Sequence, residues 1–403
     1  MSPVVGDRVV VDVGPVAHGG HCVARASGQV LFVRHALPGE TVVAEVTSAG
    51  RRRRFLRADA VEVLAASPDR REPRCPVSRA CGGCDWQHAT PAATRALKSA
   101  VVEEAMQRFA GITLPEGFSV TQVEIASAPL PGLGWRTRGT LSVDEAGRAG
   151  FLAPRSHQVV VTDSCPQLLP RLAVLDLFSR RWEPRTRVGF VAPSAGDPMA
   201  FPADAAPTDP VSERAAGLDW AVAADGFWQV HPGAPDALVE HVSRVLAPRP
   251  GDRLVDLYAG VGLFGISLLA RQPHLDLTLV EGDRRACELA RRNAGGQAVR
   301  IVRSDVDRWV QRPRSLDGAD LVVLDPPRVG AGEQVVRAVA AARPRAIAYV
   351  ACDPVALARD VATFGSLGFG IVDLVGLDLF PTTHHVECVA HLAPMDAPGP
   401  MIS

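Results

Sequence analysis

The feature that most constrains the fold is a regular alternation of apolar segments and helical stretches in the C-terminal part of the chain. Five segments have the length and composition of buried strands: Leu254 to Leu257, Leu275 to Val280, Val299 to Val302, Leu321 to Leu324 and Ile347 to Val350. This alternation is typical of a doubly wound parallel sheet with helices on both faces. Two further strands, near Val372 to Asp378 and Val386 to His391, are expected to complete it.

A glycine-rich turn follows the first of these strands. Residues 260–265 match the G-x-G-x-x-G pattern, in which glycine lets the backbone approach a cofactor, and Glu281 ends the next strand, where a carboxylate binds ribose hydroxyls. A nicotinamide cofactor and S-adenosylmethionine both fit this pattern. Asp256 within the first strand and Asp325-Pro-Pro after a later one favour an S-adenosylmethionine-dependent methyltransferase.

Cys352 follows the strand ending at Val350, at the carboxyl edge of the expected sheet, where open α/β folds bind ligands. A pyrimidine C5 is methylated more easily when a thiolate first adds to C6, and a base must then remove the C5 proton. Cys352 and Glu387 fit these two roles. The alternatives are structural: a buried cysteine often serves as a small apolar residue, and Glu387 can pair with an arginine.

Four cysteines form a separate group. Cys75, Cys81 and Cys84 have the spacing C-x5-C-x2-C, and Cys165 lies far along the chain. In a reducing compartment such a trio indicates a metal site rather than disulfides. Zinc and a [4Fe-4S] cluster both accept four thiolates. The Cys-Pro dipeptides and the Gly-Gly between two of the cysteines favour a cluster slightly, and the spacing leaves both groups open.

The N-terminal region reads as a small barrel. Residues 5 to about 63 contain five short alternating strands separated by turn signals, a pattern typical of oligonucleotide-binding barrels. The 403-residue chain has a formal net charge of -1, so nucleic-acid contacts must come from local patches. Arg51 to Arg54 with Arg57 is one such patch, with a solvated charge run as the alternative.

The chain is expected to have three parts: a barrel at 1–63, a central domain with the four cysteines at 64–225, and a methyltransferase domain at 226–403. The central part should contain a helix from about Ala92 to Phe109, mixed strands around 136–163 and an exposed connection near 193–210. The first residues alternate like a strand rather than a signal sequence, and the longest apolar stretch, 254–270, contains Asp256 and three glycines. We therefore expect a cytoplasmic monomer without a membrane segment.

These motifs together resemble the family of RNA uracil-C5 methyltransferases that carry a TRAM domain, an iron-sulfur central domain and a class I methyltransferase domain. The resemblance rests on Leu37-Pro-Gly-Glu40, Cys81-Gly-Gly-Cys84-Asp-Trp-Gln87, Phe227-Trp-Gln-Val230, Asp256-Leu-Tyr-Ala-Gly260, Leu324-Asp-Pro-Pro-Arg328, Ala351-Cys-Asp-Pro354 and His384-His-Val-Glu387. It implies a multidomain α/β protein with a TRAM/OB-like barrel and a Rossmann-like catalytic domain. It also implies that Cys352 is the nucleophile and Glu387 the base.

The same resemblance implies further site residues. S-adenosylmethionine would be contacted by Gln229, Tyr258, Glu281 and Asp325. A [4Fe-4S] cluster would be held by Cys75, Cys81, Cys84 and Cys165, with zinc as the lesser alternative. His231 and Leu263 stand where the family usually has asparagine, which affects the details of cofactor contact. The expected substrate is RNA, with ribosomal RNA favoured over transfer RNA.

Two other functions compete with uridine methylation. An RNA 5-methylcytosine methyltransferase also needs a thiol and a base, but it usually has a second cysteine in a Pro-Cys motif, which this sequence lacks. A non-catalytic RNA-binding protein built from the barrel and the cysteine group would not need Cys352 together with Glu387. The resemblance and the paired residues therefore favour 5-methyluridine formation.

Overall fold

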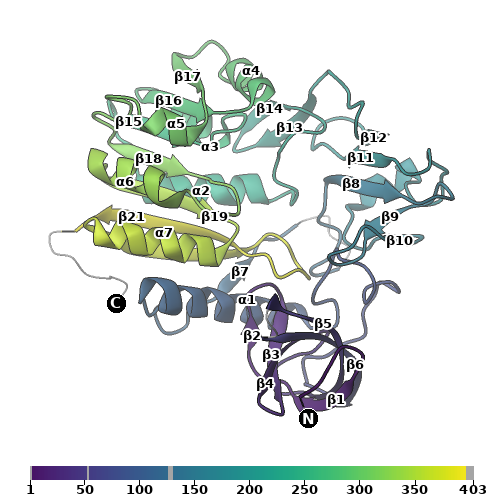
Figure 1. The fold of residues 1–403 in the computed structure, drawn as a ribbon. Helices are drawn as coiled ribbons and strands as arrows, with labels where there is room; N and C mark the ends of the chain where they lie inside the picture. The colour runs from purple at the N-terminus through teal and green to yellow at the C-terminus, as the bar shows by residue number, and fades with distance from the viewer. Residues whose placement is uncertain (1, 52–53, 126–129, 396–403) are drawn as a thin grey trace.

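The computed structural model describes residues 2–51, 54–125 and 130–395 (Figure 1). These residues form an N-terminal barrel, a central antiparallel sheet and a large C-terminal α/β unit. Arg52 and Arg53 of the predicted basic patch lie outside the described residues. No helix within the described ranges has the length and apolar character needed to cross a bilayer.

The barrel has six strands in the order β1-β5-β6-β4-β3-β2. Their bounds are β1 Arg8–Asp12, β2 Val16–Ala17, β3 His21–Ala26, β4 Gln29–Arg34, β5 Thr41–Ala49 and β6 Leu56–Ala65. Side chains alternate between inside and outside, as Val42, Ala44 and Val46 of β5 show by their complete burial. The five predicted strands are present, and the short β2 is an addition.

The C-terminal unit is built on an eight-stranded sheet of order β17-β16-β15-β18-β19-β21-β20-β7. The strands are β15 Arg253–Leu257, β16 Asp276–Glu281, β17 Val299–Arg303, β18 Leu321–Leu324, β19 Ala346–Ala351, β20 Phe369–Asp378, β21 Glu387–Pro394 and β7 Val120–Gln122. Strands β15 to β19 are parallel, as predicted. The two further strands expected to complete the sheet are present as β20 and β21. Strand β21 runs antiparallel to β19 and β20, because residues 379–386 are too few for the crossover that a parallel pair of β20 and β21 needs.

Helices cover both faces of this sheet (Figure 1). One face carries α2 Ala234–Leu246, α3 Leu263–Arg271 and α4 Arg284–Asn293. The other carries α5 Val306–Val310, α6 Gly332–Ala342 and α7 Pro354–Ser366. Strands β15, β16, β18 and β19 are mostly buried, which explains their apolar sequences, whereas the edge strand β17 is partly exposed and alternates with arginine.

Residues 91–122, which lie well before the other elements of this unit in the sequence, complete it. Strand β7 pairs in parallel with β20. Helix α1 Pro91–Ala105, continued by a π-helical turn at Met106–Ala110, packs its apolar face into the same core as α6 and α7. The helix was predicted and the strand was not. The segment 91–122 therefore packs with the C-terminal unit, although it lies within the range predicted for the central domain.

The central sheet has five antiparallel strands in the order β10-β9-β8-β11-β12. They are β8 Arg138–Val143, β9 Ala149–Leu152, β10 Val159–Val161, β11 Arg187–Val191 and β12 Met199–Pro202, with a 3-10 turn at Pro170–Leu175. A hairpin of β13 Val211–Ala215 and β14 Leu218–Val222 leads from this sheet to the C-terminal unit. Strand β12 lies within the segment predicted as an exposed connection.

Candidate active site

The predicted cofactor turn has the backbone geometry that requires glycine. Gly260 and Gly262 have φ angles of 55° and 94°. A Cβ on Gly262 would stand 2.4 Å from Ile266 Cδ1, and one on Gly265 would stand 2.6 Å from Leu279 Cδ2. A Cβ on Gly260 would meet no atom within 4 Å, so open space lies beside the first glycine. The turn therefore packs closely against its surroundings at Gly262 and Gly265 and leaves free space beside Gly260.

Two acidic side chains brace this turn. Glu281 accepts hydrogen bonds from the amides of Gly260 at 2.8 Å and Asp283 at 2.7 Å. Asp256, fully buried in β15, accepts one from the Gly265 amide at 2.9 Å, and its Oδ1 has no hydrogen-bond partner among the described residues. Burial raises the pKa of Asp256 to about 8. Glu281 therefore lies at the glycine turn, as the sequence pattern predicts.

Cys352 and Glu387 are brought together by the pairing of β19 with β21. Ala351 is opposite Cys388 in that ladder, so the next positions, Cys352 and Glu387, lie opposite each other at its end. Burial raises the pKa of Cys352 to about 12, with a further contribution from Glu387. Burial and Asp325 raise the pKa of Glu387 well above its usual range, and Arg328 opposes both shifts. Burial therefore favours the protonated form of both the thiol and the acid.

Asp325 and Arg328 belong to the same edge of the sheet. Asp325 follows β18, and its burial raises its pKa to about 7. The turn after Arg328 is held by the buried Asp360, which accepts hydrogen bonds from the Tyr349 hydroxyl at 2.6 Å and the Ala331 amide at 2.7 Å. Sequence analysis did not identify Asp360, because it lies in the middle of α7 without a motif.

The barrel reaches the residue next to the candidate nucleophile. Asp353 caps α7 by accepting hydrogen bonds from the amides of Val355 at 3.0 Å and Ala356 at 2.9 Å. Its Oδ2 also lies 3.0 Å from Nε2 of His18, in the loop between β2 and β3. This hydrogen bond is the main cause that raises the pKa of His18. The contact joins two residues 335 positions apart, and no sequence motif indicated it.

A second contact joins all three parts of the protein. The Asp85 carboxylate binds His384 at both the backbone amide, 2.9 Å, and Nδ1, 2.7 Å. Trp86 donates from Nε1 to the Gly20 carbonyl at 3.1 Å. A Cβ on Gly20 would stand 3.0 Å from His384 Cβ and 3.2 Å from Asp85 Cβ, so glycine permits this close approach.

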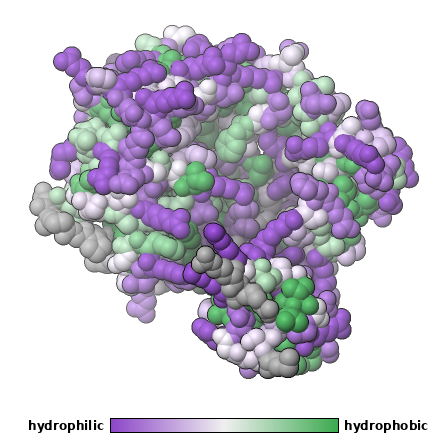
Figure 2. All heavy atoms as spheres, viewed as in Figure 1, coloured by the Kyte–Doolittle hydropathy of each residue, from purple (hydrophilic) through white to green (hydrophobic). Residues whose placement is uncertain are grey.

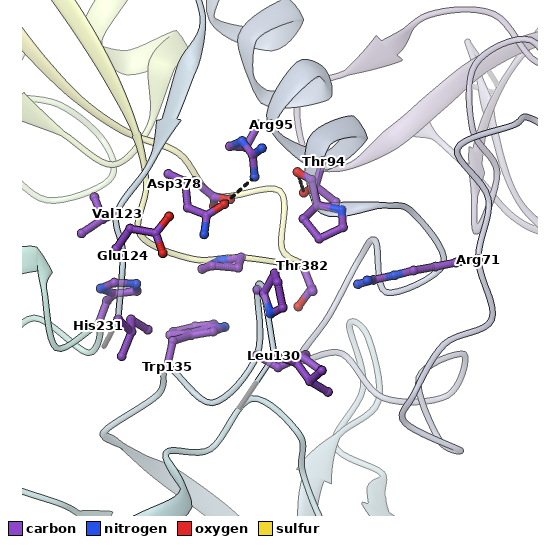
Figure 3. Close-up of a pocket in the computed structure, with 17 residues that line it drawn as sticks. Arg71, Thr94, Arg95, Val123, Glu124, Leu130, Trp135, His231, Asp378 and Thr382 are labelled. Carbon is purple, nitrogen blue, oxygen red and sulfur yellow. Dashed lines mark hydrogen bonds between the residues drawn. The ribbon is translucent and has the colours of Figure 1, made fainter. Parts of the chain in front are cut away.

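Gln229 and His231 lie before α2. Gln229 is buried, and the Val230 carbonyl accepts hydrogen bonds from the Thr137 amide at 2.9 Å and hydroxyl at 3.0 Å. Burial lowers the pKa of His231 to about 4, so it is neutral at pH 7. Figure 3 shows His231 and Glu124 near Trp135 in a cavity of about 160 Å³, with Arg71 at the other side. His231, where the family usually has asparagine, thus lines this cavity.

The four predicted ligand cysteines line one small cavity, together with Arg136. Donors point at two of the sulfurs: the Gly83 amide lies 3.3 Å from Cys81 Sγ, and Gln87 Nε2 lies 3.0 Å from Cys84 Sγ. Burial raises the pKa of Cys84 to about 12 and that of Cys165 to about 11. Within the described part of the chain, no three His, Cys, Asp or Glu side chains are grouped closely enough to hold a single metal ion.

A cationic and aromatic surface spans the barrel and the central sheet. Arg57 lies over the ring of Phe55, 4.9 Å from its centroid, and Phe55 packs edge-on against Phe32 at 5.2 Å. Arg155, in the turn after β9, approaches His21 at 3.5 Å. Figure 2 shows that the visible face of the molecule is largely hydrophilic. Arginines beside aromatic rings are the side chains that bind single-stranded nucleic acid.

The Rossmann-like sheet, its glycine turn and the carboxylates at its carboxyl edge define an S-adenosylmethionine-dependent methyltransferase. Residues 4–61 match the TRAM domain family, 233–346 the methyltransferase small domain family, and 315–394 the tRNA (Uracil-5-)-methyltransferase family. The chain belongs to the TRAM-domain family of RNA uracil-C5 methyltransferases.

Full-length relatives establish this membership. A Streptomyces avermitilis protein named an uncharacterized RNA methyltransferase is 43% identical, covering 97% of this chain and 99% of its own. A 23S rRNA uracil-C5 methyltransferase of Alkalilimnicola ehrlichii is 33% identical, covering 93% and 94%. The fold resembles a Pyrococcus abyssi tRNA uracil-C5 methyltransferase bound to S-adenosyl-L-homocysteine, with a TM-score of 0.68, 22% identity, and 95% and 99% coverage.

Proposed function

We propose that this enzyme forms 5-methyluridine in ribosomal RNA through a covalent bond between Cys352 Sγ and C6 of the target uracil. The observation that carries the proposal is the pairing of Cys352 with Glu387 at the end of the β19–β21 ladder, beside Asp325 and close along the sheet edge to the glycine turn. The ribosomal substrate is supported by the Alkalilimnicola relative, and transfer RNA is the alternative.

The reaction divides between the two side chains. Cys352 reacts as the thiolate, after its proton has passed to solvent, and Sγ adds to C6 of the uracil. This makes C5 nucleophilic enough to take the methyl group that S-adenosylmethionine would supply, with S-adenosylhomocysteine as the leaving group. For the second step Glu387 must be ionised, its own proton having passed to solvent. The carboxylate then accepts the proton from C5, and the bond between Sγ and C6 breaks to release the product and the thiolate. Burial raises the pKa of both groups and so opposes their ionisation, whereas the positive charge of Arg328 favours the ionised form of each.

We propose that Gln229, Tyr258, Glu281 and Asp325 contact S-adenosylmethionine. Support comes from the amide-bound carboxylate of Glu281 beside the open space at Gly260, where ribose hydroxyls would replace neighbouring solvent. Tyr258 has a left-handed backbone, φ 65°, which turns the chain away from β15 toward that space. Asp325 ends the adjacent strand β18.

We propose that Cys75, Cys81, Cys84 and Cys165 hold a [4Fe-4S] cluster, with four-cysteine zinc as the alternative. The donor set fits: four thiols line one cavity, and hydrogen-bond donors approach two of the sulfurs. The Cys-Pro dipeptides and the Gly-Gly between Cys81 and Cys84 favour the cluster over zinc. Its role would be to join segment 75–84 to the part of the chain around Cys165.

We propose that the RNA lies across the surface formed by Phe32, Phe55 and Arg57 of the barrel and Arg155 of the central sheet. Aromatic rings offer stacking faces to bases, and guanidinium groups bind phosphates. His18, which belongs to the barrel, contacts Asp353, the residue after Cys352. The barrel surface therefore continues toward the sheet edge that carries Cys352 and Glu387. We also propose that the enzyme acts as a monomer, because a single chain supplies both reacting side chains. A ribosomal substrate supports a cytoplasmic location.

The test is methyl transfer from labelled S-adenosylmethionine to ribosomal and transfer RNA isolated from a strain lacking the gene. Nucleoside analysis should find the label in 5-methyluridine, and ribosomal RNA should be the better substrate. Label in 5-methylcytidine would overturn the proposed base, and preference for transfer RNA would overturn the proposed substrate. RNA binding without any transfer would favour the non-catalytic alternative.

A further inference from the structure

Arg136 is a shielded cation without a carboxylate partner. Its Nε is out of reach of water and has no hydrogen-bond partner, and among the described residues no carboxylate forms an ion pair with its guanidinium. The guanidinium lies over the ring of Trp135, 5.3 Å from the centroid. Arg138, two residues further on, is also buried but binds Glu213 Oε1 at 2.8 Å. One of these two arginines is thus paired with a carboxylate and the other is not.

The ionisable groups that share a cavity with Arg136 are the four cysteines. Arg136 lines the same small cavity as the four predicted ligands, and the negative charges that would stabilise its guanidinium are those of Cys165, Cys84 and Cys81. A charge removed from water is costly unless an opposite charge compensates it. Neutral thiols bring no charge, whereas metal-bound thiolates do, because a thiol must lose its proton to bind a metal.

We propose that Arg136 is the counter-cation of the group held by the four cysteines, and that this group therefore carries a net negative charge. The inference rests on the proposed metal site. Four thiolates bring four negative charges, and neither a zinc ion nor a doubly charged iron-sulfur core neutralises them. The guanidinium would favour thiolate over thiol at each ligand. For a cluster it would also favour the reduced, more negative form.

Two consequences follow for the bound group. Without the positive charge, acid should protonate the ligands more readily and the group should leave faster. A cluster should in addition become harder to reduce, because net charge sets its potential. Neither effect depends on methyl transfer, so both are measured on the isolated protein.

The experiment compares anaerobically purified wild type, Arg136→Met, Arg136→Lys and Arg138→Met. Arg138→Met is the matched control, since it removes a buried arginine two residues further along the chain, at the start of β8, while leaving Arg136 in place. The readouts are iron and sulfide content, the rate of absorbance loss near 400 nm on mild acidification, and the midpoint potential. We expect Arg136→Met to lose its cluster at least about fivefold faster and to have a more negative potential, as loss of one nearby charge predicts.

Arg136→Lys should stay within about twofold of wild type because it keeps the charge. Arg138→Met should unfold more easily with an unchanged potential. An unchanged loss rate and potential in Arg136→Met, or an equal shift in Arg138→Met, would overturn the proposal. If Arg136→Met aggregates, the Arg136→Lys variant provides the test. Loss of its cluster despite the retained charge would show that the shape of the arginine side chain, and not its charge, holds the cluster, and would overturn the proposal.

The proposed cluster can fail separately from Arg136. Colourless wild type with one zinc per chain would overturn the iron-sulfur assignment. Zinc release to a chelator would then replace absorbance as the readout, with the same expected ratio between variants. Wild type that binds neither iron nor zinc would overturn both proposals.

Discussion

At the scale of single residues, burial sets the protonation of the side chains at the carboxyl edge of the sheet, here called the reacting edge. Cys352, Glu387 and Asp325 all have pKa values raised because the low-dielectric edge of the sheet disfavours their charged forms. Arg328 is the cation that opposes this for the first two. The RNA-free enzyme should therefore hold an unreactive thiol, which becomes a nucleophile when the substrate is in place.

The first prediction concerns alkylation of Cys352 in the RNA-free enzyme. A thiol with a pKa of about 12 has little thiolate at pH 8, so iodoacetamide should label Cys352 more than about tenfold more slowly than free cysteine. The rate should keep rising with pH above 9, where that of free cysteine levels off. Arg328→Gln should slow labelling further. Peptide mass spectrometry follows Cys352 alone, and labelling as fast as free cysteine would contradict the burial effect.

The second prediction concerns the base. Glu387→Gln keeps the shape of the side chain but removes the group that accepts the C5 proton, so addition and methyl transfer proceed while release stops. A methylated covalent complex of enzyme and RNA should accumulate on denaturing gels. Asp360→Asn, which perturbs the nearby turn without removing the base, is the control and should form no such complex. Turnover by Glu387→Gln at the wild-type rate would assign the base to another group.

Sequence motifs predicted Cys352 and Glu387 as the reacting pair because the proposed chemistry restricts both positions to few residue types. They did not indicate His18, Asp360 or the role proposed for Arg136. Each of these acts through a contact with residues distant in the chain or on another element, and nothing in its immediate sequence differs from an ordinary surface or helix residue. Such roles become visible when the fold brings the partners together.

At the scale of elements, the alternating pattern predicted the parallel strands correctly because β15, β16, β18 and β19 are buried apolar runs and the edge strand β17 keeps apolar residues at Val299, Ile301 and Val302. Strand β7 was missed because Val-Thr-Gln is too short to show any periodicity. The direction of β21 depended on the length of its connection rather than on its residues. Helix α1 and β7 join the C-terminal unit through Lys98, whose Nζ binds Asp378 Oδ1 at 2.5 Å and the Phe380 carbonyl at 2.9 Å.

The third prediction tests this buried pair. Lys98→Met leaves the Asp378 carboxylate buried without its cation, which should lower the free energy of unfolding by about 3–5 kcal/mol. Lys98→Met combined with Asp378→Leu replaces the pair by apolar groups and should recover most of that loss. Urea unfolding followed by fluorescence measures both. Equal stability of the single variant and wild type would show that α1 is not anchored through this pair.

At the scale of the whole molecule, the barrel, the cysteine-rich segment and the catalytic unit meet at one place. Gly20, Asp85 and His384 are in close contact there, and His18 binds Asp353 nearby. The three parts were predicted from composition and motifs, but their docking was not, because a single sequence carries no record of which surfaces touch. Through these contacts the barrel, with its cationic and aromatic surface, is joined to the sheet edge that carries Cys352 and Glu387.

The fourth prediction tests that surface with two matched arginines. Arg57 lies 4.9 Å over Phe55 on the proposed RNA surface, and Arg180 lies 4.3 Å over Trp182 in the central domain. Arg57→Ala should weaken binding of a single-stranded RNA and reduce the slope of log affinity against log salt by about 0.7. Arg180→Ala should leave both unchanged. Fluorescence anisotropy across a salt series measures them, and equal effects of the two variants would remove the RNA from the proposed surface.

The measurement that tests the enzyme's chemistry most directly uses RNA containing 5-fluorouridine. Fluorine does not leave as a proton does, so the reaction should stop after methyl transfer with the base still bonded to the enzyme. With labelled S-adenosylmethionine we predict a denaturation-resistant complex that contains RNA and label, and whose modified peptide maps to Cys352. Cys352→Ala should give no complex, and Cys388→Ala should give the wild-type result. The absence of any complex, or a complex that maps to another residue, would contradict Cys352 as the nucleophile.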